Sequence, residues 1–332
     1  MPATQKDIAQ KLNISQQLVS YALTGAPGVG EKMRQRILKE AEAQGYVPNR
    51  MARALVTGRT NQIALCFPTV TSPLAQDLSR QFQKLAQPTS YDLLTISTQG
   101  IEHHPGLVAV DGAFFFGSAP GNIPIDCPTV EILLDMRGSN AGPPPRHDAI
   151  LVNLEKASRA AIEHLLEQGA RRIAYVSTPI MMGAREPRYR AYSAALRKRG
   201  LRIEDISVKL PADEFHRELT HQALEKYFSQ RGFPDALFCS NDEVAIGAYR
   251  ALRQFGRRIP EETAVIGCHD YNEAPDHVPA LSSIRLPIPD ICRCAWEMLT
   301  ARIKNPALPP QEKQFVAQLV VRESSLWKCD AR

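Results

Sequence analysis

Apolar residues in the first sixty positions recur at helical spacing and predict three short helices. Their approximate spans are 5–12, 16–23 and 31–44. Thr4 and Asp7 form a capping-box-like pair at the first start, and Ser15 offers an N-cap to the second helix after a three-residue turn. Gly45 ends the third helix. This pattern is typical of a helix-turn-helix closed by a third helix.

Beyond residue 60, short apolar runs alternate with amphipathic segments. The expected strands are 63–67, 92–96, 113–116, 130–134, 172–177, 207–210, 236–240 and 264–267. The expected helices begin near Leu74 and span about 154–167, 188–199, 216–229 and 243–255. Continuous apolar strands between amphipathic helices predict parallel sheets covered on both faces. We therefore expect an α/β body of two doubly wound lobes.

Composition is that of an ordinary globular chain. With 332 residues, 44% of them hydrophobic and 23% charged, the chain is long enough for two or three domains of about 150 residues. It has no apolar run of about 18 residues and no secretory leader pattern, which predicts a cytoplasmic protein without a membrane span. The seven cysteines form no CxxC pair, so we expect reduced thiols and no metal site.

The excess positive charge lies entirely in the head. Residues 1–60 hold nine Lys/Arg and four Asp/Glu, which equals the net charge of +5 for the whole chain. A basic head on a neutral body is the electrostatic pattern of polyanion binding. A solubility tail is the alternative, but this segment carries too many apolar residues to fit it.

The second helix of such a head enters the major groove of DNA, because only that groove admits a helix. Gln16 and Gln17 lie at its N-terminal end, where an amide can pair with adenine N6 and N7. Tyr21 lies one turn later and can contact a base or sugar. Without the surrounding helix-turn-helix, the same residues would be interpreted as an ordinary solvated helix face.

The head resembles the lac/gal/purine repressor family, the LacI/GalR family. The resemblance rests on Thr4-Gln-Lys-Asp-Ile-Ala-Gln-Lys-Leu-Asn-Ile-Ser-Gln-Gln-Leu-Val-Ser-Tyr and on Gly45-Tyr-Val-Pro-Asn-Arg-Met-Ala-Arg-Ala-Leu55. It implies a DNA-binding domain at 1–48 and a hinge helix with linker at 49–60. It also implies double-stranded operator DNA as the partner, with Thr4, Ser15 and Ser20 as further DNA contacts.

The same resemblance assigns a role to the segment from Asn49 to Val56. In the family this hinge folds on the operator, where a leucine from each protomer of a homodimer enters the minor groove. Leu55 stands at that leucine, and Ala52 allows the paired helices to approach. Arg50 and Arg53 are expected phosphate contacts, with Asn49 beside them. An apolar wedge that kinks DNA, in a helix too short to be stable alone, agrees with this role.

The body resembles the same family and, through it, the periplasmic sugar-binding proteins. The stretches that carry this are Asn241-Asp-Glu-Val-Ala-Ile-Gly-Ala and Leu281-Ser-Ser-Ile-Arg, among others. The resemblance implies an effector-binding and dimerisation domain at 61–332. Its two discontinuous lobes are about 61–150 plus 286–312 and about 151–285 plus 313–332. The helix near 287–304 is expected to return to the first lobe.

Small ligands bind between such lobes, at the carboxyl ends of strands. By resemblance, Arg188 grips the effector and Asn241 bonds it, with Asp242 as a helix cap. Asp135 stands at a carboxylate near a strand end, and Phe215 at an aromatic that stacks on the ligand.

Two departures from the family pattern affect the effector and the dimer. His269 stands where the family usually has an aspartate that accepts sugar hydroxyls, and Leu286 replaces a frequent glutamine. A histidine facing Arg188 would suit an anionic or aromatic effector. The region between Gln99 and Gly112 is too short for the family's helix near the dimer interface, which puts the usual dimer contacts in doubt.

The sequence therefore predicts a dimeric, sequence-specific transcriptional regulator, most often a repressor, that is controlled by a small-molecule effector and uses no cofactor. The alternative is a DNA-binding regulator whose degenerate cleft responds to no small molecule. An enzyme is disfavoured, because the chain shows no nucleophile elbow, Walker loop, zinc spacing or GxGxxG motif.

Overall fold

The computed structural model describes residues 3–47, 58–98, 109–117, 127–134, 147–177, 186–208 and 216–327. Two compact units are present, Met1–Thr60 and Asn61–Arg332. The first is called the head below and the second the body.

The head is a three-helix unit built around a small apolar core. Its helices are α1 (Gln5–Leu12), α2 (Gln16–Thr24) and α3 (Glu31–Ala43). Ile8, Val19 and Ile37, one from each helix, are fully buried against one another. The predicted helices and their inward faces are therefore confirmed, because the i, i+3, i+4 spacing of apolar residues places them on one side of each helix.

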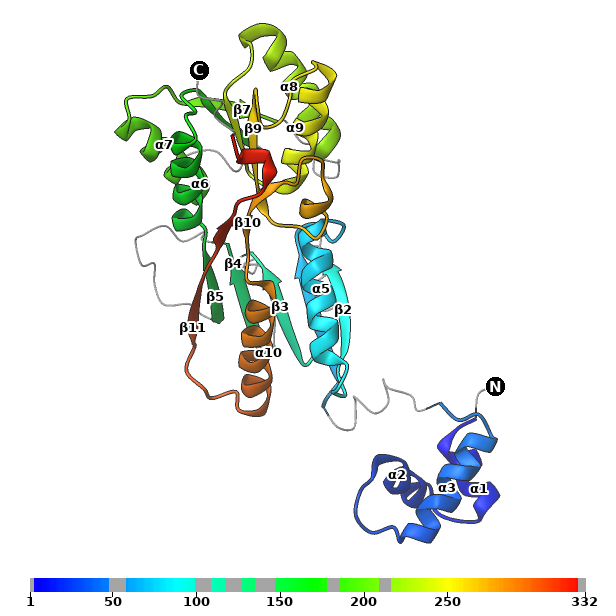
Figure 1. Cartoon of the computed structure of the whole chain (residues 1–332). Coiled ribbons are helices and arrows are strands. Elements are labelled where there is room, and N and C mark those ends of the chain that lie inside the picture. The colour runs from blue at the N-terminus through cyan, green and yellow to red at the C-terminus, as the bar shows by residue number, and fades with distance from the viewer. Residues whose placement is uncertain are drawn as a thin grey trace. The chain divides into compact units, whose positions relative to one another are not determined.

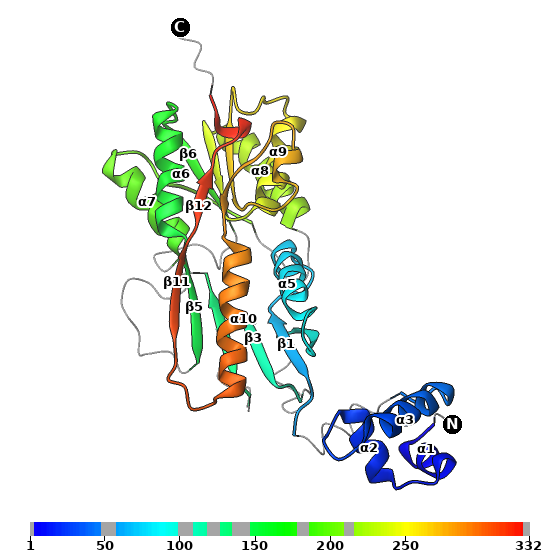
Figure 2. The ribbon, with the colours of Figure 1, turned by 60° about the horizontal axis from the view of Figure 1, so that its bottom comes forward.

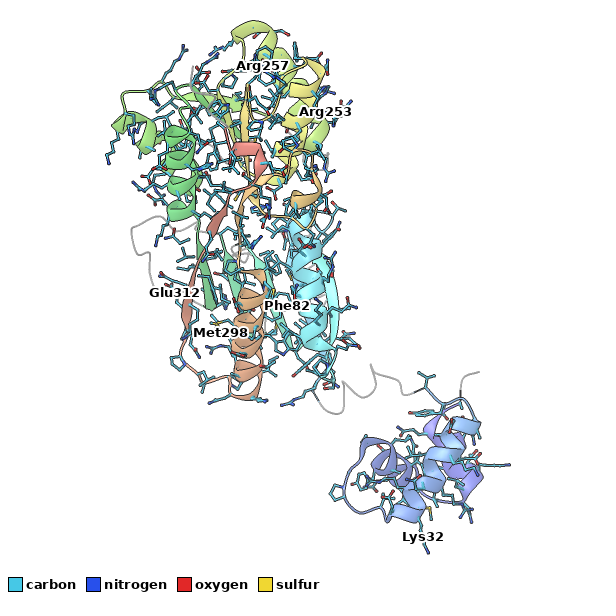
Figure 3. The ribbon with its side chains drawn as sticks, in the orientation of Figure 1. Lys32, Phe82, Arg253, Arg257, Met298 and Glu312 are labelled. Atoms are coloured by element: carbon cyan, nitrogen blue, oxygen red, sulfur yellow. The ribbon has the colours of Figure 1, made fainter. Side chains whose placement is uncertain are left out.

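The first lobe of the body is a six-stranded sheet with two packed helices (Figure 1). The strands are β1 (Gln62–Phe67), β2 (Asp92–Ser97), β3 (Gly112–Phe116), β4 (Thr129–Leu133), β5 (Asp148–Asn153) and β11 (Glu312–Val316), in the order β11-β5-β4-β3-β1-β2. The helices α5 (Pro73–Ala86) and α10 (Ile288–Lys304) pack side by side on this sheet. Phe82 and Met298, labelled in Figure 3, belong to the core that these helices cover.

The second lobe is also a six-stranded sheet, in the order β12-β10-β9-β8-β6-β7. The strands are β6 (Ile173–Ser177), β7 (Glu204–Ser207), β8 (Ala236–Cys239), β9 (Ala264–His269), β10 (Ser282–Arg285) and β12 (Gln318–Val320). The helices are α6 (Glu155–Glu167), α7 (Pro187–Lys198), α8 (His216–Arg231) and α9 (Asp242–Gln254), with short 3-10 turns at Ala274–Asp276 and Glu323–Ser325.

Helices cover both faces of this second sheet. Along β6, Ile173 and Tyr175 face one apolar core, while Ala174 and Val176 face another. The helices α6 and α7 pack together, and α8 and α9 form a separate pair (Figures 1 and 2). The predicted α/β class with mainly parallel strands is confirmed, and cover on both faces is confirmed for this second sheet. Among the described strands, β10 and β12 form the antiparallel pair.

The chain passes between the lobes in three places within the described residues. β5 leads into α6, β10 leads into α10, and β11 leads into β12. The helix α10 lies against α5, β3, β4 and β5, so it belongs to the first lobe. Each lobe is therefore assembled from segments far apart in the sequence.

Two details of the strand predictions are wrong. β7 lies at Glu204–Ser207, not at 207–210, because Arg172 neutralises Glu204 and allows an acidic residue to start a strand beside β6. Of the described strands, the predictions also omit β5, whose apolar run pairs with both β4 and β11, and the later strands β10, β11 and β12. Among the described helices, none is long and apolar enough to cross a bilayer.

Candidate nucleic-acid interface and inter-lobe site

The first helix of the head begins at a reciprocal cap. Thr4 Oγ1 accepts from the Asp7 backbone N–H at 3.3 Å, while Asp7 Oδ2 accepts from the Thr4 backbone N–H at 2.8 Å. The hydrogen bond from the Thr4 hydroxyl is the main cause that lowers the pKa of Asp7. The capping box predicted from sequence is confirmed, and the Thr4 side chain is engaged in it.

The second helix of the head exposes the residues that we expect to read DNA. Ser15 Oγ accepts from the Leu18 N–H at 3.2 Å and so caps α2. Gln16 and Gln17 are exposed on the first turn, and Gln17 Nε2 donates to Tyr21 Oη at 2.9 Å. Ser20 is half-buried on the same helix.

This arrangement orders two side chains on one exposed face of α2. The Gln17–Tyr21 bond orders two side chains without a partner molecule, since it links positions i and i+4. The side-chain oxygen of Gln17, Oε1, takes no part in this bond and can accept a hydrogen bond from another group. The predicted hinge contacts Asn49, Arg50, Ala52, Arg53 and Leu55 lie outside the described residues.

Arg188, the predicted effector contact, is held inside the second lobe by protein groups. Its Nε donates to Glu186 Oε1 at 2.7 Å, and its Nη1 donates to the Ser240 carbonyl and lies 3.8 Å from Cys268 Sγ. Burial alone would lower the pKa of Arg188, but the charge and hydrogen bond of Glu186, together with the nearby Cys268 and Tyr175 side chains, outweigh it, and the pKa is raised. Arg188 is therefore charged.

Glu186 is the residue that organises this cluster, and the sequence analysis did not select it. Its carboxylate accepts from Tyr175 Oη at 3.1 Å and from the Tyr189 N–H at 2.7 Å, which makes it the N-cap of α7. A carboxylate directly before Pro187 at the first helical turn is a recognisable N-cap signal. The sequence therefore contained a local signal for Glu186.

The cap of α9 is Asn241, not Asp242. Asn241 is the N-cap of α9, because its Oδ1 accepts from the Val244 N–H at 2.9 Å. The expectation that Asp242 caps this helix is wrong. Asp242 is buried, and it accepts from Ser283 Oγ at 2.6 Å and from the Tyr271 N–H at 2.7 Å.

His269 lies at the carboxyl end of β9 in an unusual backbone conformation. Its φ is 99°, and that of the next residue, Asp270, is 53°. Two consecutive non-glycine residues in the left-handed region store strain that the surroundings must hold. Ser283 Oγ accepts from the Asp270 N–H, and Arg322 and Arg285 bind the Asp270 carboxylate at 2.6 Å each.

The result of this turn is a pair of aromatic polar side chains near the inter-lobe junction. His269 is buried, and its Nδ1 lies 3.0 Å from Tyr271 Oη. Of the five predicted effector contacts, Arg188, Asn241 and His269 all stand at the carboxyl side of the second sheet. Asp135 and Phe215 lie outside the described residues.

A direct bond joins the two lobes beside this group. Asn272 Nδ2, three residues after His269, donates to Asp77 Oδ1 of α5 at 3.0 Å, and Arg80 Nη1 donates to the same oxygen at 3.1 Å. Sequence reasoning missed Asp77, since nothing in the local pattern of α5 marks it. The bond shows that the carboxyl-end loop of β9 meets the N-terminal half of α5.

Comparison with known proteins agrees with this architecture. A model of the periplasmic binding protein-like domain matches residues 162–325. The ribose operon repressor of Haemophilus influenzae is 26% identical over 335 residues, covering 97% of this chain and 98% of the relative. The probable HTH-type transcriptional repressor ExuR of Bacillus subtilis is 26% identical over 338 residues, with the same coverage.

A solved structure extends the likeness to the whole fold. The lac repressor dimer bound to operator and the anti-inducer ONPF superposes with a TM-score of 0.81 at 19% identity, covering 98% of this chain and 100% of that one. The full-length relatives named above are transcriptional repressors. With a helix-turn-helix head and a two-lobed periplasmic-binding-protein-like body, this chain is similar over nearly its whole length to these transcriptional repressors.

Proposed function

We propose that this chain represses transcription by binding a palindromic operator as a homodimer. The observation that carries the proposal is the exposed α2 face, where Gln16, Gln17 and Tyr21 project from a capped and well-packed helix. Two such helices in a dimer read half-sites about 34–36 Å apart, one turn of duplex. The basic head supplies the phosphate attraction that base reading requires.

The hinge is part of the same proposal. Leu55 acts as the minor-groove wedge, Ala52 permits close approach of the paired hinges, and Arg50, Arg53 and Asn49 contact the backbone, with Thr4, Ser15 and Ser20 supporting the head on DNA. The activity is binding without catalysis, and a protein that acts on chromosomal operators resides in the cytoplasm.

A small molecule bound between the lobes regulates the proposed operator binding. An effector that prefers one arrangement of the lobes changes how readily two hinges pair, and the coupling is reciprocal. The residues expected to hold it are Asp135, Arg188, Phe215, Asn241 and His269. The Asp77–Asn272 bond joins the two lobes, so a change in the arrangement of the lobes would alter or break it.

The Arg188–Glu186 pair bears on the class of effector. Because the two charges neutralise each other, the pair attracts an anion less than a lone arginine would. We therefore propose a neutral, hydroxyl-bearing effector in preference to the anionic or aromatic effector predicted from sequence. The names of the relatives point to the same class, since one is a ribose operon repressor.

Selection of genomic fragments by the purified full-length protein tests the DNA-binding proposal. We expect the retained fragments to share a two-fold symmetric site, with affinity that falls steeply as salt rises. Equal binding to the selected site and to scrambled duplex, at low and high salt, would refute base-specific recognition. Thermal shifts with pentoses, hexoses and sugar acids then test the effector class separately.

A further inference from the structure

The second lobe carries a charged cavity at the edge of its sheet remote from the effector-site residues. The cavity has a volume of about 380 Å³ and is lined by Arg172, Arg202, Glu204 and Arg231. These residues stand at the amino ends of β6, β7 and β8. Arg188, Asn241 and His269 belong to the opposite, carboxyl edge, because all three strands run in parallel.

One arginine and the glutamate form the fixed wall of the cavity. Arg172 donates to both Glu204 oxygens, at 2.8 and 3.0 Å, and also to the carbonyls of Phe233 and Arg231. Tyr227 Oη adds a further hydrogen bond to Glu204. The charges of Arg172 and Glu204 therefore cancel, and their side chains are held in one geometry.

The acidic groups nearby are already engaged. Burial opposes ionisation of Glu204, but hydrogen bonds from Arg172 and Tyr227, together with the charges of Arg172 and Arg202, lower its pKa. Asp235 Oδ2 accepts from the backbone N–H groups of Arg171 and Arg172 at 2.8 Å each. Neither carboxylate is available to neutralise another cation.

The remaining two arginines give the cavity its excess of positive charge. The side chains of Arg202 and Arg231 are exposed, and they make no hydrogen bond or ion pair with the part of the chain that the structure describes. A guanidinium presents a fork of donors that matches phosphate oxygens, and it stays charged at any physiological pH. The cavity thus combines the two exposed guanidinium groups of Arg202 and Arg231 with the hydrogen-bonded Arg172–Glu204 pair.

We infer that this cavity binds a small dianion of the phosphate class, with Arg202 and Arg231 as its ligands. Three arginines and one glutamate give the cavity a net charge of about +2, which is opposite and equal to the charge of a phosphate monoester dianion. All four lining side chains are charged, which suits a hydrophilic anion better than an apolar ligand. The inference is independent of the proposed operator and effector.

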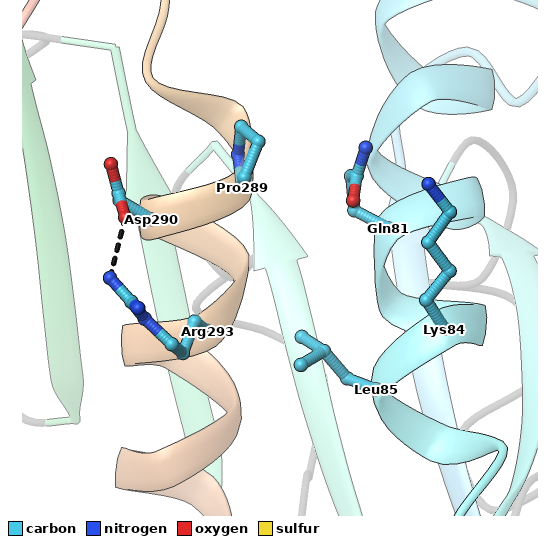
Figure 4. Close-up of a pocket in the computed structure, with 6 residues that line it drawn as sticks. All are labelled: Gln81, Lys84, Leu85, Pro289, Asp290 and Arg293. Atoms are coloured by element: carbon cyan, nitrogen blue, oxygen red, sulfur yellow. Dashed lines mark hydrogen bonds and ion pairs between the residues drawn. The ribbon is translucent and has the colours of Figure 1, made fainter.

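A second pocket lies in the first lobe, between α5 and α10, and differs from the charged cavity in its lining (Figure 4). Its arginine, Arg293, is paired with Asp290 at 2.5 Å, and Leu85 and Pro289 contribute apolar surface. Lys84 is its other cation. This pocket has no pair of guanidinium groups, so we do not assign it an anion.

Calorimetric titration of the full-length protein with inorganic phosphate, sulfate and glucose 6-phosphate tests the inference, with sodium chloride at matched ionic strength as the blank. We expect saturable phosphate binding that weakens at least about tenfold in R202Q/R231Q, because charge-assisted hydrogen bonds are lost. The charge-retaining R202K/R231K variant should bind more tightly than R202Q/R231Q. Tighter binding of glucose 6-phosphate than of inorganic phosphate would identify a phosphorylated metabolite as the ligand.

The matched control is R253Q/K304Q, which removes two exposed cations elsewhere; Arg253 lies on α9 (Figure 3). It should bind phosphate like the unaltered protein. Absence of saturable binding, or equal binding by R202Q/R231Q and the unaltered protein, would overturn the inference. Neither result would affect the operator proposal, because Arg202 and Arg231 belong to the body, whereas the residues proposed to read DNA belong to the head.

Discussion

Arg188 Nε donates to Glu186 Oε1 at 2.7 Å, and both side chains are less than one-tenth exposed. The positive charge of Arg188, which the sequence pattern predicted to contact a ligand, is thus already balanced by Glu186 inside the protein. Because the pair is buried, removal of one partner leaves an uncompensated charge.

Glu186→Ala should lower the free energy of unfolding by about 3–5 kcal/mol, since it strands the buried Arg188 charge. Glu186→Gln should cost less, because its amide oxygen can still accept one of the two bonds, from Arg188 or from the Tyr189 N–H. Urea denaturation measures both. Unchanged stability of Glu186→Ala would show that this is not a buried ion pair that stabilises the fold.

The absence of a side chain at Gly267 leaves space for the Asp242 carboxylate. A Cβ at Gly267 would lie 2.1 Å from Asp242 Oδ1. Gly267→Ala should therefore destabilise the body by about 1–3 kcal/mol through overpacking. Gly30→Ala is the control, because its added methyl would meet no atom within 4 Å. Similar melting temperatures for both variants would contradict the steric argument.

Burial raises the pKa of Asp242 from 3.8 to about 7. Between these values the folded protein holds a proton that the unfolded chain has released, so the free energy of unfolding should fall as pH rises from about 4 to about 7. Above that window this contribution is constant. Asp242→Asn should remove this part of the slope in urea titrations at several pH values. An unchanged slope would show that other groups cause it.

Gln17→Ala should weaken the operator complex by about 1–3 kcal/mol and relax the preference at one base position. Tyr21→Phe keeps the aromatic ring and removes the acceptor of the 2.9 Å bond from Gln17. It therefore distinguishes the effect of this hydrogen bond from the effect of the ring. Quantitative binding to the selected site and to its single-base variants measures both effects. An equal loss on random duplex would argue against base reading by Gln17.

The Asp77–Asn272 bond should couple the two lobes energetically. In a double-mutant cycle of Asp77→Ala and Asn272→Ala, we expect a coupling of about 0.5–1.5 kcal/mol in the free energy of unfolding. The same variants should shift the effector concentration that changes operator binding. Strict additivity in the cycle would mean that the 3.0 Å bond does not link the lobes in solution.

Local signals in the sequence determined most of the secondary structure. The capping pair Thr4 and Asp7, the N-cap Ser15 and the apolar spacing of Ile8, Val19 and Ile37 define the head, because these interactions span only three or four residues or follow from helical periodicity. The same periodicities predicted the α/β body. They misplaced β7 because its first residue, Glu204, is a strand residue only when Arg172 neutralises it.

Tertiary structure alone decided which side chains meet at the sites. Asp77 and Asn272 are 195 positions apart, and Asp242 and Ser283 are 41 apart, so no local pattern pairs them. Sheet order and the three crossings between lobes bring the carboxyl ends of distant strands together, and they gather Arg172, Arg202 and Arg231 at the opposite edge. The sequence named the residue types, but the long-range strand pairing set their neighbours and therefore their charge balance.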